Sequence, residues 1–341
     1  MKREVTGNPG GWSRMLVSRR SLAALALGLT AASRGAGAQA PGAMPAGTVR
    51  IVVPYPPGGI TDILARGLAQ QMTTILGNTF VVENRPGANG SIGATAVARA
   101  QPDGLTLLLG VTDTHAVNPA AMRNLPYDAL RDFEPISNIT NVPLVLAVGP
   151  TRRELADLRA FIAAAKAQPG GLTHSSWGVG STSQIAMLRL GDAAGMELLH
   201  VPFTGAAPAA QALAAGQVDS MVLPAGAGEA LSRDGRVRIL AALSPQRLSL
   251  LPAVPTLQEQ GVQLTVSIFQ AVFAPARTPA PIVARLNQAM QQALQAPGMQ
   301  DILRGQAALA DHTTPQGLTD LVRQEQEAWG RIVRAGNIRL D

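Results

Sequence analysis

The stretch Ile51–Asp62, IVVPYPPGGITD, contains a strand, a turn and the start of a helix. The β-branched run Ile51–Val53 predicts a buried strand. The prolines after it end the strand, and Gly58-Gly59 supplies backbone that can bend where other residues would clash. From Thr61 onward apolar residues recur every three to four positions, which predicts an amphipathic helix. The first N–H groups of such a helix are free, and at the carboxyl end of a strand they suit an anion.

Five residues of this loop are candidate ligand contacts: Pro57, Gly58, Gly59, Thr61 and Asp62. Ordinary structural roles are also open, with Thr61 as a helix cap and Asp62 as the partner of Arg66 one turn later. These roles explain Asp62 well. They explain two consecutive glycines less well, because a plain strand-to-helix turn needs only one.

The chain then alternates short strands and helices. Strands are predicted at Thr79–Glu83 and Leu105–Gly110, with a helix at Ile92–Ala100 between them. This order favours a parallel sheet with right-handed crossovers. The second of these strands leads into a loop, Val111–His115, on the sheet edge where ligands of open α/β sheets bind, and Thr112 in that loop is a further candidate contact.

Two long apolar stretches, Val142–Val148 and Val262–Ala274, are interpreted as strands that cross between two lobes. A second α/β series lies between them. We therefore predict an α/β protein of two hinged lobes, each a mainly parallel sheet flanked by helices. The predicted bounds are 48–144 with 266–341 for the first lobe and 145–265 for the second.

The second lobe has its own glycine- and hydroxyl-rich loop in front of a predicted helix. The candidate contacts in it are Trp177, Gly180, Ser181, Thr182 and Ser183. An ordinary N-cap cluster would also use serine or threonine there, but three hydroxyls exceed the need of one cap. If the two loops face each other across a cleft, the two helix starts would hold one carboxylate from both lobes.

Residues 1–38 are typical of an export signal. Five basic residues precede an apolar run from Leu22 to Leu29, and small residues allow cleavage after Ala38 or Ala40. The run is too short to anchor a helix in a membrane. Arg19-Arg20 leaves both the Sec and the twin-arginine export routes open. We expect a soluble protein in the periplasm.

The charge balance argues against a nucleic-acid partner. The chain has 28 basic and 22 acidic residues, a net charge of +6, but six of the basic residues and one acidic residue lie within residues 1–38. The remaining 22 basic and 21 acidic residues leave a net charge of +1. Aromatic residues make up only 3% of the chain, which disfavours a base-stacking surface.

Catalytic and metal-binding patterns are missing from the sequence. There are no cysteines, which excludes thiolate metal sites and cysteine nucleophiles, and the four histidines lack metal-ligand spacing. The glycine-rich loop Asn84–Ser91 lacks the lysine of a phosphate-binding P-loop, so a turn that shapes the cleft wall is the favoured interpretation. We predict no catalytic residues, no metal and no cofactor, and keep a periplasmic enzyme as a minor alternative.

The order of nine sequence blocks is the most specific signal in the chain. From about Val49 to Asp341 the blocks are PPGGITD, VENRPGANGSIGA, PDGLTLLLG, LPYD, HVPFTG, GQVDSM, PAVPT, APARTP and AGNIRLD. Together they resemble the periplasmic substrate-binding receptors of tripartite tricarboxylate transporters, the Bug family. The resemblance implies a two-lobe, type II periplasmic-binding fold that holds a carboxylate largely by main-chain amides and waters. It adds second-lobe contacts at Pro202, Phe203, Thr204 and Gly205.

The sequence departs from the family pattern mainly in the second lobe. The family usually has serine near Trp177, tyrosine at Phe203 and lysine at Thr204, and it has alanine where Pro57 stands in the first lobe. Loss of a tyrosine hydroxyl and a lysine makes the far end of the cleft more apolar. Trp177 is expected to narrow the cleft or to stack on a ligand. These differences favour a carboxylate with an apolar or aromatic body over citrate.

The leading hypothesis is therefore a monomeric periplasmic receptor. It would capture a small organic carboxylate between its lobes and deliver it to the membrane permease subunits of a tripartite transporter. A periplasmic sensor that feeds a signalling partner is an open alternative. The sequence leaves the identity of the carboxylate open.

Overall fold

The computed structural model describes Gly7, residues 44–336 and Ile338. The predicted export signal, residues 1–38, lies outside the described residues apart from Gly7, as do both candidate cleavage positions. Within the described part of the chain, no helix is long and apolar enough to cross a lipid bilayer.

Five strands form the first sheet. In its parallel part, β1 (Val49–Val53) lies between β2 (Phe80–Asn84) and β3 (Thr106–Val111). Beyond β3 follow two antiparallel strands, β9 (Ser267–Pro275) and β4 (Phe133–Val148). Because β1 has helices on both sides, its β-branched run is buried throughout, as is usual for a central parallel strand.

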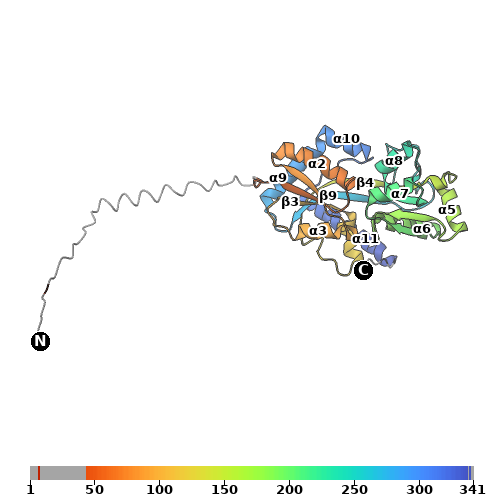
Figure 1. Ribbon diagram of the computed structural model, residues 1–341, viewed down its shortest axis with the longest axis horizontal. Helices are drawn as coiled ribbons and strands as arrows, with labels where there is room; N and C mark the ends of the chain where they lie inside the picture. Colours follow the sequence, from red (N-terminus) through yellow and green to blue (C-terminus); the bar gives the residue numbers. More distant parts are fainter. Residues whose placement is uncertain (1–6, 8–43, 337, 339–341) are drawn as a thin grey trace, which may run out of the picture. The chain divides into compact units, whose positions relative to one another are not determined.

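β4 also belongs to the second sheet. Its residues up to Pro143 pair with β9, whereas its last five residues pair with β7 (Ser220–Pro224). The second sheet is completed by β5 (Thr173–Ser176), β6 (Leu199–Pro202) and β8 (Arg238–Ala242). β4 therefore joins the two sheets, and Figure 1 shows β4 and β9 running between the two groups of helices.

Helices cover both sheets (Figure 1). Those around the first sheet are α2 (Ile60–Leu76), α3 (Ser91–Ala98), α4 (Asn118–Ala121), α9 (Ala280–Gln295), α10 (Pro297–Gly305) and α11 (Pro315–Ala335). Those around the second are α5 (Leu158–Ala167), α6 (Thr182–Ala194), α7 (Ala206–Ala214) and α8 (Ala225–Arg233). Short helical turns are η1 (Ala88–Gly90), η2 (Asp113–Val117) and η3 (Pro150–Arg152). The predicted α/β class is confirmed, with mixed sheets, because the two crossing strands run antiparallel to their neighbours.

Both crossing strands differ from the predicted bounds. β4 begins at Phe133 instead of Val142, because the polar residues in its first half find partners far away in the sequence: Asn138 Nδ2 donates to Asp311 at 2.8 Å, and Thr140 Oγ1 donates to the Leu309 carbonyl at 2.7 Å. The other strand, β9, starts five residues later than predicted. Val262 and Leu264 are buried in the core without belonging to a strand.

Several helical segments were not predicted, among them η2 and α8. The predicted loop Val111–His115 is in fact the end of β3 followed by η2, whose start is fixed by Thr114 Oγ1, which accepts the Val111 N–H at 3.0 Å. α8 contains Gly226 and Gly228, which lower helix propensity.

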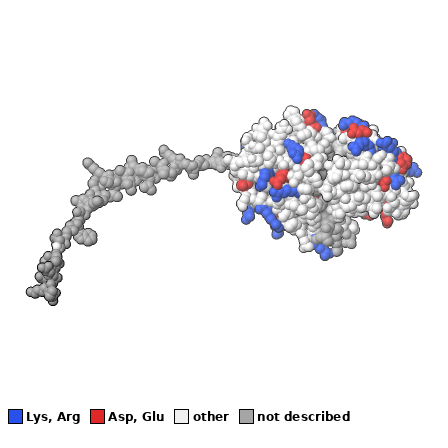
Figure 2. All heavy atoms as spheres, in the orientation of Figure 1, with Lys and Arg blue, Asp and Glu red and all other residues white. Residues whose placement is uncertain are grey.

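The surface of the described chain carries both signs of charge, and Figure 2 shows basic and acidic side chains interspersed on the visible face.

Candidate ligand-binding site

The loop after β1 leads directly into α2. Gly58 has a φ of +88°, which favours glycine, and Gly59 is the N-cap residue of α2. Thr61 lies inside the first turn, so it is not the helix cap that the sequence left open. The first helical hydrogen bond runs from the Ile63 N–H to the Gly59 carbonyl at 3.0 Å. The N–H groups of Ile60 and Thr61 therefore have no acceptor within the helix, and they carry the positive end of its dipole.

Asp62 braces this loop. Its carboxylate accepts hydrogen bonds from the Gly58 N–H at 3.1 Å, from Asn84 Nδ2 at 2.9 Å and from Arg66 at 2.9 and 3.0 Å. Burial opposes the charge, but the hydrogen bonds from Arg66, Asn84 and Gly58 lower the pKa of Asp62. The ion pair with Arg66 that the sequence suggested as an alternative role is present, and it fixes the loop that leads into α2.

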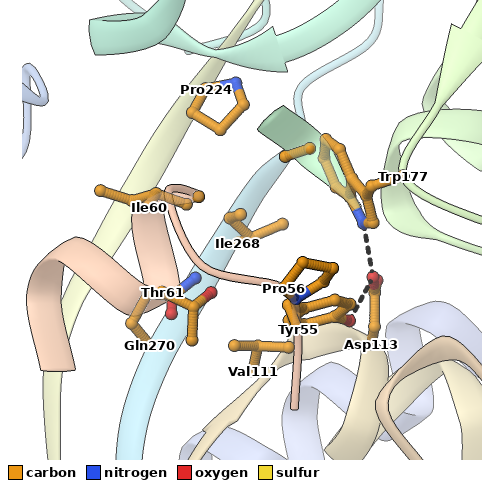
Figure 3. A pocket seen from close by; sticks show the side chains of 12 residues that line it. Tyr55, Pro56, Ile60, Thr61, Val111, Asp113, Trp177, Pro224, Ile268 and Gln270 are labelled. Atoms are coloured by element: carbon orange, nitrogen blue, oxygen red, sulfur yellow. Dashed lines mark hydrogen bonds between the residues drawn. The ribbon is translucent and has the colours of Figure 1, made fainter. Parts of the chain in front are cut away.

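A pocket, called the central pocket below, lies between the two sheets. Its lining residues are Tyr55, Pro56, Gly59, Ile60, Thr61, Val111, Asp113, Trp177, Ala206, Pro224, Ile268 and Gln270. They come from the β1–α2 loop, the end of β3 and β9 on one side and from the ends of β5 and β7 and the start of α7 on the other (Figure 3). The non-atom space in the pocket is about 440 Å³, a figure that includes its opening to solvent.

Two adjoining pockets share residues with the central pocket. One shares Trp177 and is also lined by Pro202, Phe203 and Thr204. The other shares Gly59 and is also lined by Gly58. The three pockets together are called the groove below. Seven of the fifteen predicted contacts line it: Gly58, Gly59, Thr61, Trp177, Pro202, Phe203 and Thr204.

The two sides of this groove approach each other closely at Gly205. A Cβ atom at this position would lie 2.8 Å from Cδ of Pro56, which is too close for a side chain. At Gly58 a Cβ would lie 3.7 Å from Cβ of Ala207, an ordinary contact. Gly205 is therefore needed where the N-cap of α7 meets the β1–α2 loop. Pro57 is exposed beside this contact.

Gln270 is a site residue that the sequence analysis missed. It lies on β9, is fully buried and lines the central pocket. Neither its Nε2 nor its Oε1 has a hydrogen-bond partner among the described residues. A buried amide of this kind is costly unless something pairs with it. The available signal was its position as the single polar residue between Ile268 and Pro275 of an apolar strand.

Asp113 was also missed, although the neighbouring Thr112 was predicted. The Asp113 carboxylate is buried and accepts hydrogen bonds from Tyr55 Oη at 3.0 Å, Trp177 Nε1 at 2.7 Å, the Thr182 N–H at 2.9 Å and the Thr182 hydroxyl. Burial raises the pKa of Asp113 against the effect of these donors. The Thr112 hydroxyl is buried and accepts the Phe269 N–H at 2.9 Å, so it links β3 to β9.

The hydroxyls of the second-lobe loop already have partners within the protein. Ser181 Oγ caps α6 by accepting from the Gln184 N–H, and it donates to the Gly178 carbonyl at 2.7 Å. Ser183 Oγ donates to the Val222 carbonyl at 2.6 Å. The Gly180 N–H donates to the Gln184 side chain at 2.6 Å. Ser181 therefore has the capping role that the sequence left open, and Trp177 is the residue of this loop that lines the central pocket.

No metal centre or accessible catalytic pair was found in the described residues. No group of three or more histidine, aspartate or glutamate side chains is arranged to hold a metal ion in the described ranges. Ser176 Oγ lies 2.7 Å from His200 Nε2, but Ser176 has no exposed surface and its hydroxyl also contacts the Gly178 carbonyl. This pair is a structural contact beneath the loop.

The sequence and the fold match a known family. The model of the tripartite tricarboxylate transporter family receptor matches residues 64–338. The chain belongs to this receptor family. BugT from Bordetella pertussis is 36% identical to the receptor over 302 residues, which cover 87% of this chain and 91% of BugT.

Solved structures of similar proteins agree with the assignment. MatC (Rpa3494) from Rhodopseudomonas palustris, whose structure contains bound malate, is 34% identical in sequence to the receptor. The two structures superpose over 85% of the receptor and 100% of MatC, with a TM-score of 0.81. R. palustris Rpa4515 with adipate is 31% identical, with 86% of the receptor and 99% of that chain covered and a TM-score of 0.83. The resemblance to Bug receptors and the two-lobe periplasmic-binding fold are thereby confirmed. The family and its structural neighbours, among them the periplasmic binding protein BugD, are substrate-binding proteins and not enzymes.

Proposed function

We propose that the receptor captures a small organic carboxylate with an apolar or aromatic body in the central pocket. The carboxylate of the ligand accepts hydrogen bonds from the Ile60 and Thr61 N–H groups at the start of α2 and from Gln270 Nε2. The receptor then delivers the ligand to the membrane subunits of a tripartite transporter. MatC with malate and Rpa4515 with adipate, both carboxylate complexes of similar proteins, support this proposal.

The unpaired amide of Gln270 is the observation that carries the proposal. Gln270 and Thr61 lie together on one side of the pocket in Figure 3. A helix start supplies hydrogen-bond donors and a favourable dipole for an anion, and the amide adds a neutral donor. None of the twelve lining residues is lysine or arginine, so an acid would be held by neutral groups.

The walls of the pocket support an apolar ligand body. Apart from Thr61, Gln270, Asp113 and the Tyr55 hydroxyl, the lining side chains are apolar, with Trp177 as the largest. Burial of apolar ligand surface against such walls contributes roughly 25 cal/mol per Å². Citrate, which has three carboxylates and a hydroxyl, would leave most of its polar groups without partners there.

The proposal includes closure of two lobes, 48–144 with 266–341 and 145–265, around the ligand. Because residues from both sheets line the pocket, a bound ligand would bridge them and favour the closed arrangement. The change of β4 from one sheet to the other after Pro143 supports a boundary at that point. Export by the predicted signal and action as a monomer belong to the same proposal.

Titration calorimetry with benzoate, hexanoate and citrate tests the ligand class. We expect benzoate or hexanoate to bind with a dissociation constant on the order of micromolar, which is about −8 kcal/mol, because a transport receptor must also release its ligand. Citrate is expected to bind more weakly. Preferential binding of citrate would contradict the proposed ligand class.

A Gln270→Leu variant tests the site itself. It keeps the volume of the side chain but removes the unpaired amide, so we expect affinity for the bound acid to fall at least about tenfold, while stability is unchanged or higher. Gln260→Leu is the matched control, because the Gln260 amide donates to the Leu240 carbonyl at 3.1 Å and Gln260 does not line the central pocket. Equal affinity of Gln270→Leu and wild type would place the ligand elsewhere.

A further inference from the structure

Asp113 connects the two sides of the central pocket. Asp113 begins η2, just after β3 ends, so it belongs to the first sheet. Its neighbour Tyr55 also belongs to the first sheet, because it follows β1. Its other partners, Trp177 after β5 and Thr182 at the start of α6, belong to the second sheet. Figure 3 shows Asp113 and Trp177 on the side of the pocket opposite Gln270 and Thr61.

The hydrogen-bonding capacity of the Asp113 carboxylate is fully used. A carboxylate has about four acceptor positions. Oδ1 accepts the N–H and the hydroxyl of Thr182, and Oδ2 accepts Tyr55 Oη and Trp177 Nε1. Asp113 therefore has no free acceptor position for a cationic group of a ligand. The donors of Trp177 and Thr182, which face this end of the pocket from the second sheet, are already paired with Asp113.

We propose that Asp113 is a specificity-determining residue that takes the place of a second ligand carboxylate, so that the receptor selects monocarboxylates over dicarboxylates. This inference rests on the proposed function and narrows its ligand class. The ligand would place its single carboxylate at Gln270 and the start of α2. Its apolar end would then lie towards Trp177 and Asp113.

A second carboxylate at that end would meet two obstacles. It would find no free donor, because Trp177 Nε1 and the Thr182 N–H are directed at Asp113. It would also approach a like charge in a buried site, and no lysine or arginine lines the pocket to offset the repulsion. The first obstacle rests on geometry, because these donors point at the oxygens of Asp113 in the structure.

Matched acid pairs test the proposal. Hexanoate and adipate have the same chain length, and benzoate and terephthalate share one ring, but the second member of each pair has one more carboxylate. We expect wild-type receptor to bind the monocarboxylate of at least one pair at least about tenfold more tightly than its dicarboxylate. In Asp113→Ala, the freed N–H groups of Trp177 and Thr182 can donate hydrogen bonds to the second carboxylate, so the preference should fall by at least about tenfold.

Two further variants keep the test decisive. Asp113→Asn removes the charge with little change in shape and should also reduce the preference, which covers the case in which Asp113→Ala fails to fold. Asp192→Ala removes an exposed acid from α6, the helix that begins at Thr182, and should leave the preference unchanged. Wild-type receptor that binds dicarboxylates as tightly as monocarboxylates, or Asp113 variants that retain the wild-type preference, would overturn the inference while the receptor function stands. Binding of none of the four acids by wild type or variants would contradict the proposed carboxylate receptor.

Discussion

Two buried carboxylates near the pocket differ in their partners. Asp62 has an arginine partner and lies at the start of α2, so its charge is compensated and its pKa is lowered despite burial. Asp113 has only neutral donors, and burial raises its pKa. The i,i+4 spacing of Asp62 and Arg66 could be read from the sequence. The partners of Asp113 could not, because Trp177 and Thr182 are more than sixty residues away.

Buried histidines predict how stability depends on pH. Burial lowers the pKa of His115 to about 3, and burial together with the nearby His200 lowers the pKa of His174 to about 4. In the unfolded chain both pKa values are near 6.5. As the pH falls below 6.5, the unfolded state therefore binds protons that the folded state does not, and stability is lost down to about pH 4. Each histidine contributes a slope of up to about 1.4 kcal/mol per pH unit.

Urea unfolding at pH 7, 6 and 5 measures this slope. His115→Gln should reduce the loss of stability between pH 6 and 5 by about one histidine's share, up to about 1.4 kcal/mol. Paired carboxylates such as Asp62 contribute in a different window, because their stabilisation is lost only as the pH falls below about 3.9. A slope that is the same in His115→Gln and wild type would contradict the burial of a neutral imidazole against Phe273.

At the level of single elements, the two helix starts in the groove are built differently. α6 has a side-chain cap, Ser181, whereas α2 begins at Gly59 without one. We predict that Ser181→Ala destabilises the receptor by about 1 kcal/mol, the usual value of an N-cap hydroxyl. Thr61→Ala should cost less than Ser181→Ala, because Thr61 is not a cap. Equal losses in denaturant unfolding of the two variants would show that Thr61 does have a capping role.

The elements that the sequence predicted are those with a clear local pattern. β1 and α2 were predicted within about two residues, because a β-branched run, a proline stop and a helical apolar period all lie within the segment itself. α8 was missed because Gly226 and Gly228 mask its helical character. The first half of β4 was missed because its polar residues are satisfied by Asp311 and Leu309. Gln270 was missed because it lies in an apolar strand, and its position beside the central pocket depends on the neighbours of that strand in the fold.

For the whole molecule, the approach of the two sheets depends on close backbone packing at Gly226. A Cβ at this position in α8 would lie 2.4 Å from the carbonyl oxygen of Gly305, the last residue of α10. Figure 1 shows α8 and α10 next to each other although they belong to opposite sides of the groove. Gly226→Ala should therefore push the two sides apart at a point outside the lining of the central pocket.

We expect Gly226→Ala to weaken ligand binding by about tenfold. Overpacking at this contact would oppose the approach of the two sheets by about 1–3 kcal/mol, and residues of both sheets line the pocket. Gly305→Ala is the control, since a Cβ there would point into open space. Calorimetry reports the affinity and small-angle scattering reports the separation of the two sides. Wild-type affinity together with an unchanged scattering profile in Gly226→Ala would argue against closure of the groove as the basis of binding.

A crystal structure of the receptor with a bound monocarboxylate tests the central claim most directly. We predict density for the acid in the central pocket, with its carboxylate oxygens within hydrogen-bond distance of the Ile60 and Thr61 N–H groups and of Gln270 Nε2. An acid bound outside this pocket, or one whose carboxylate points away from Gln270, would contradict the claim.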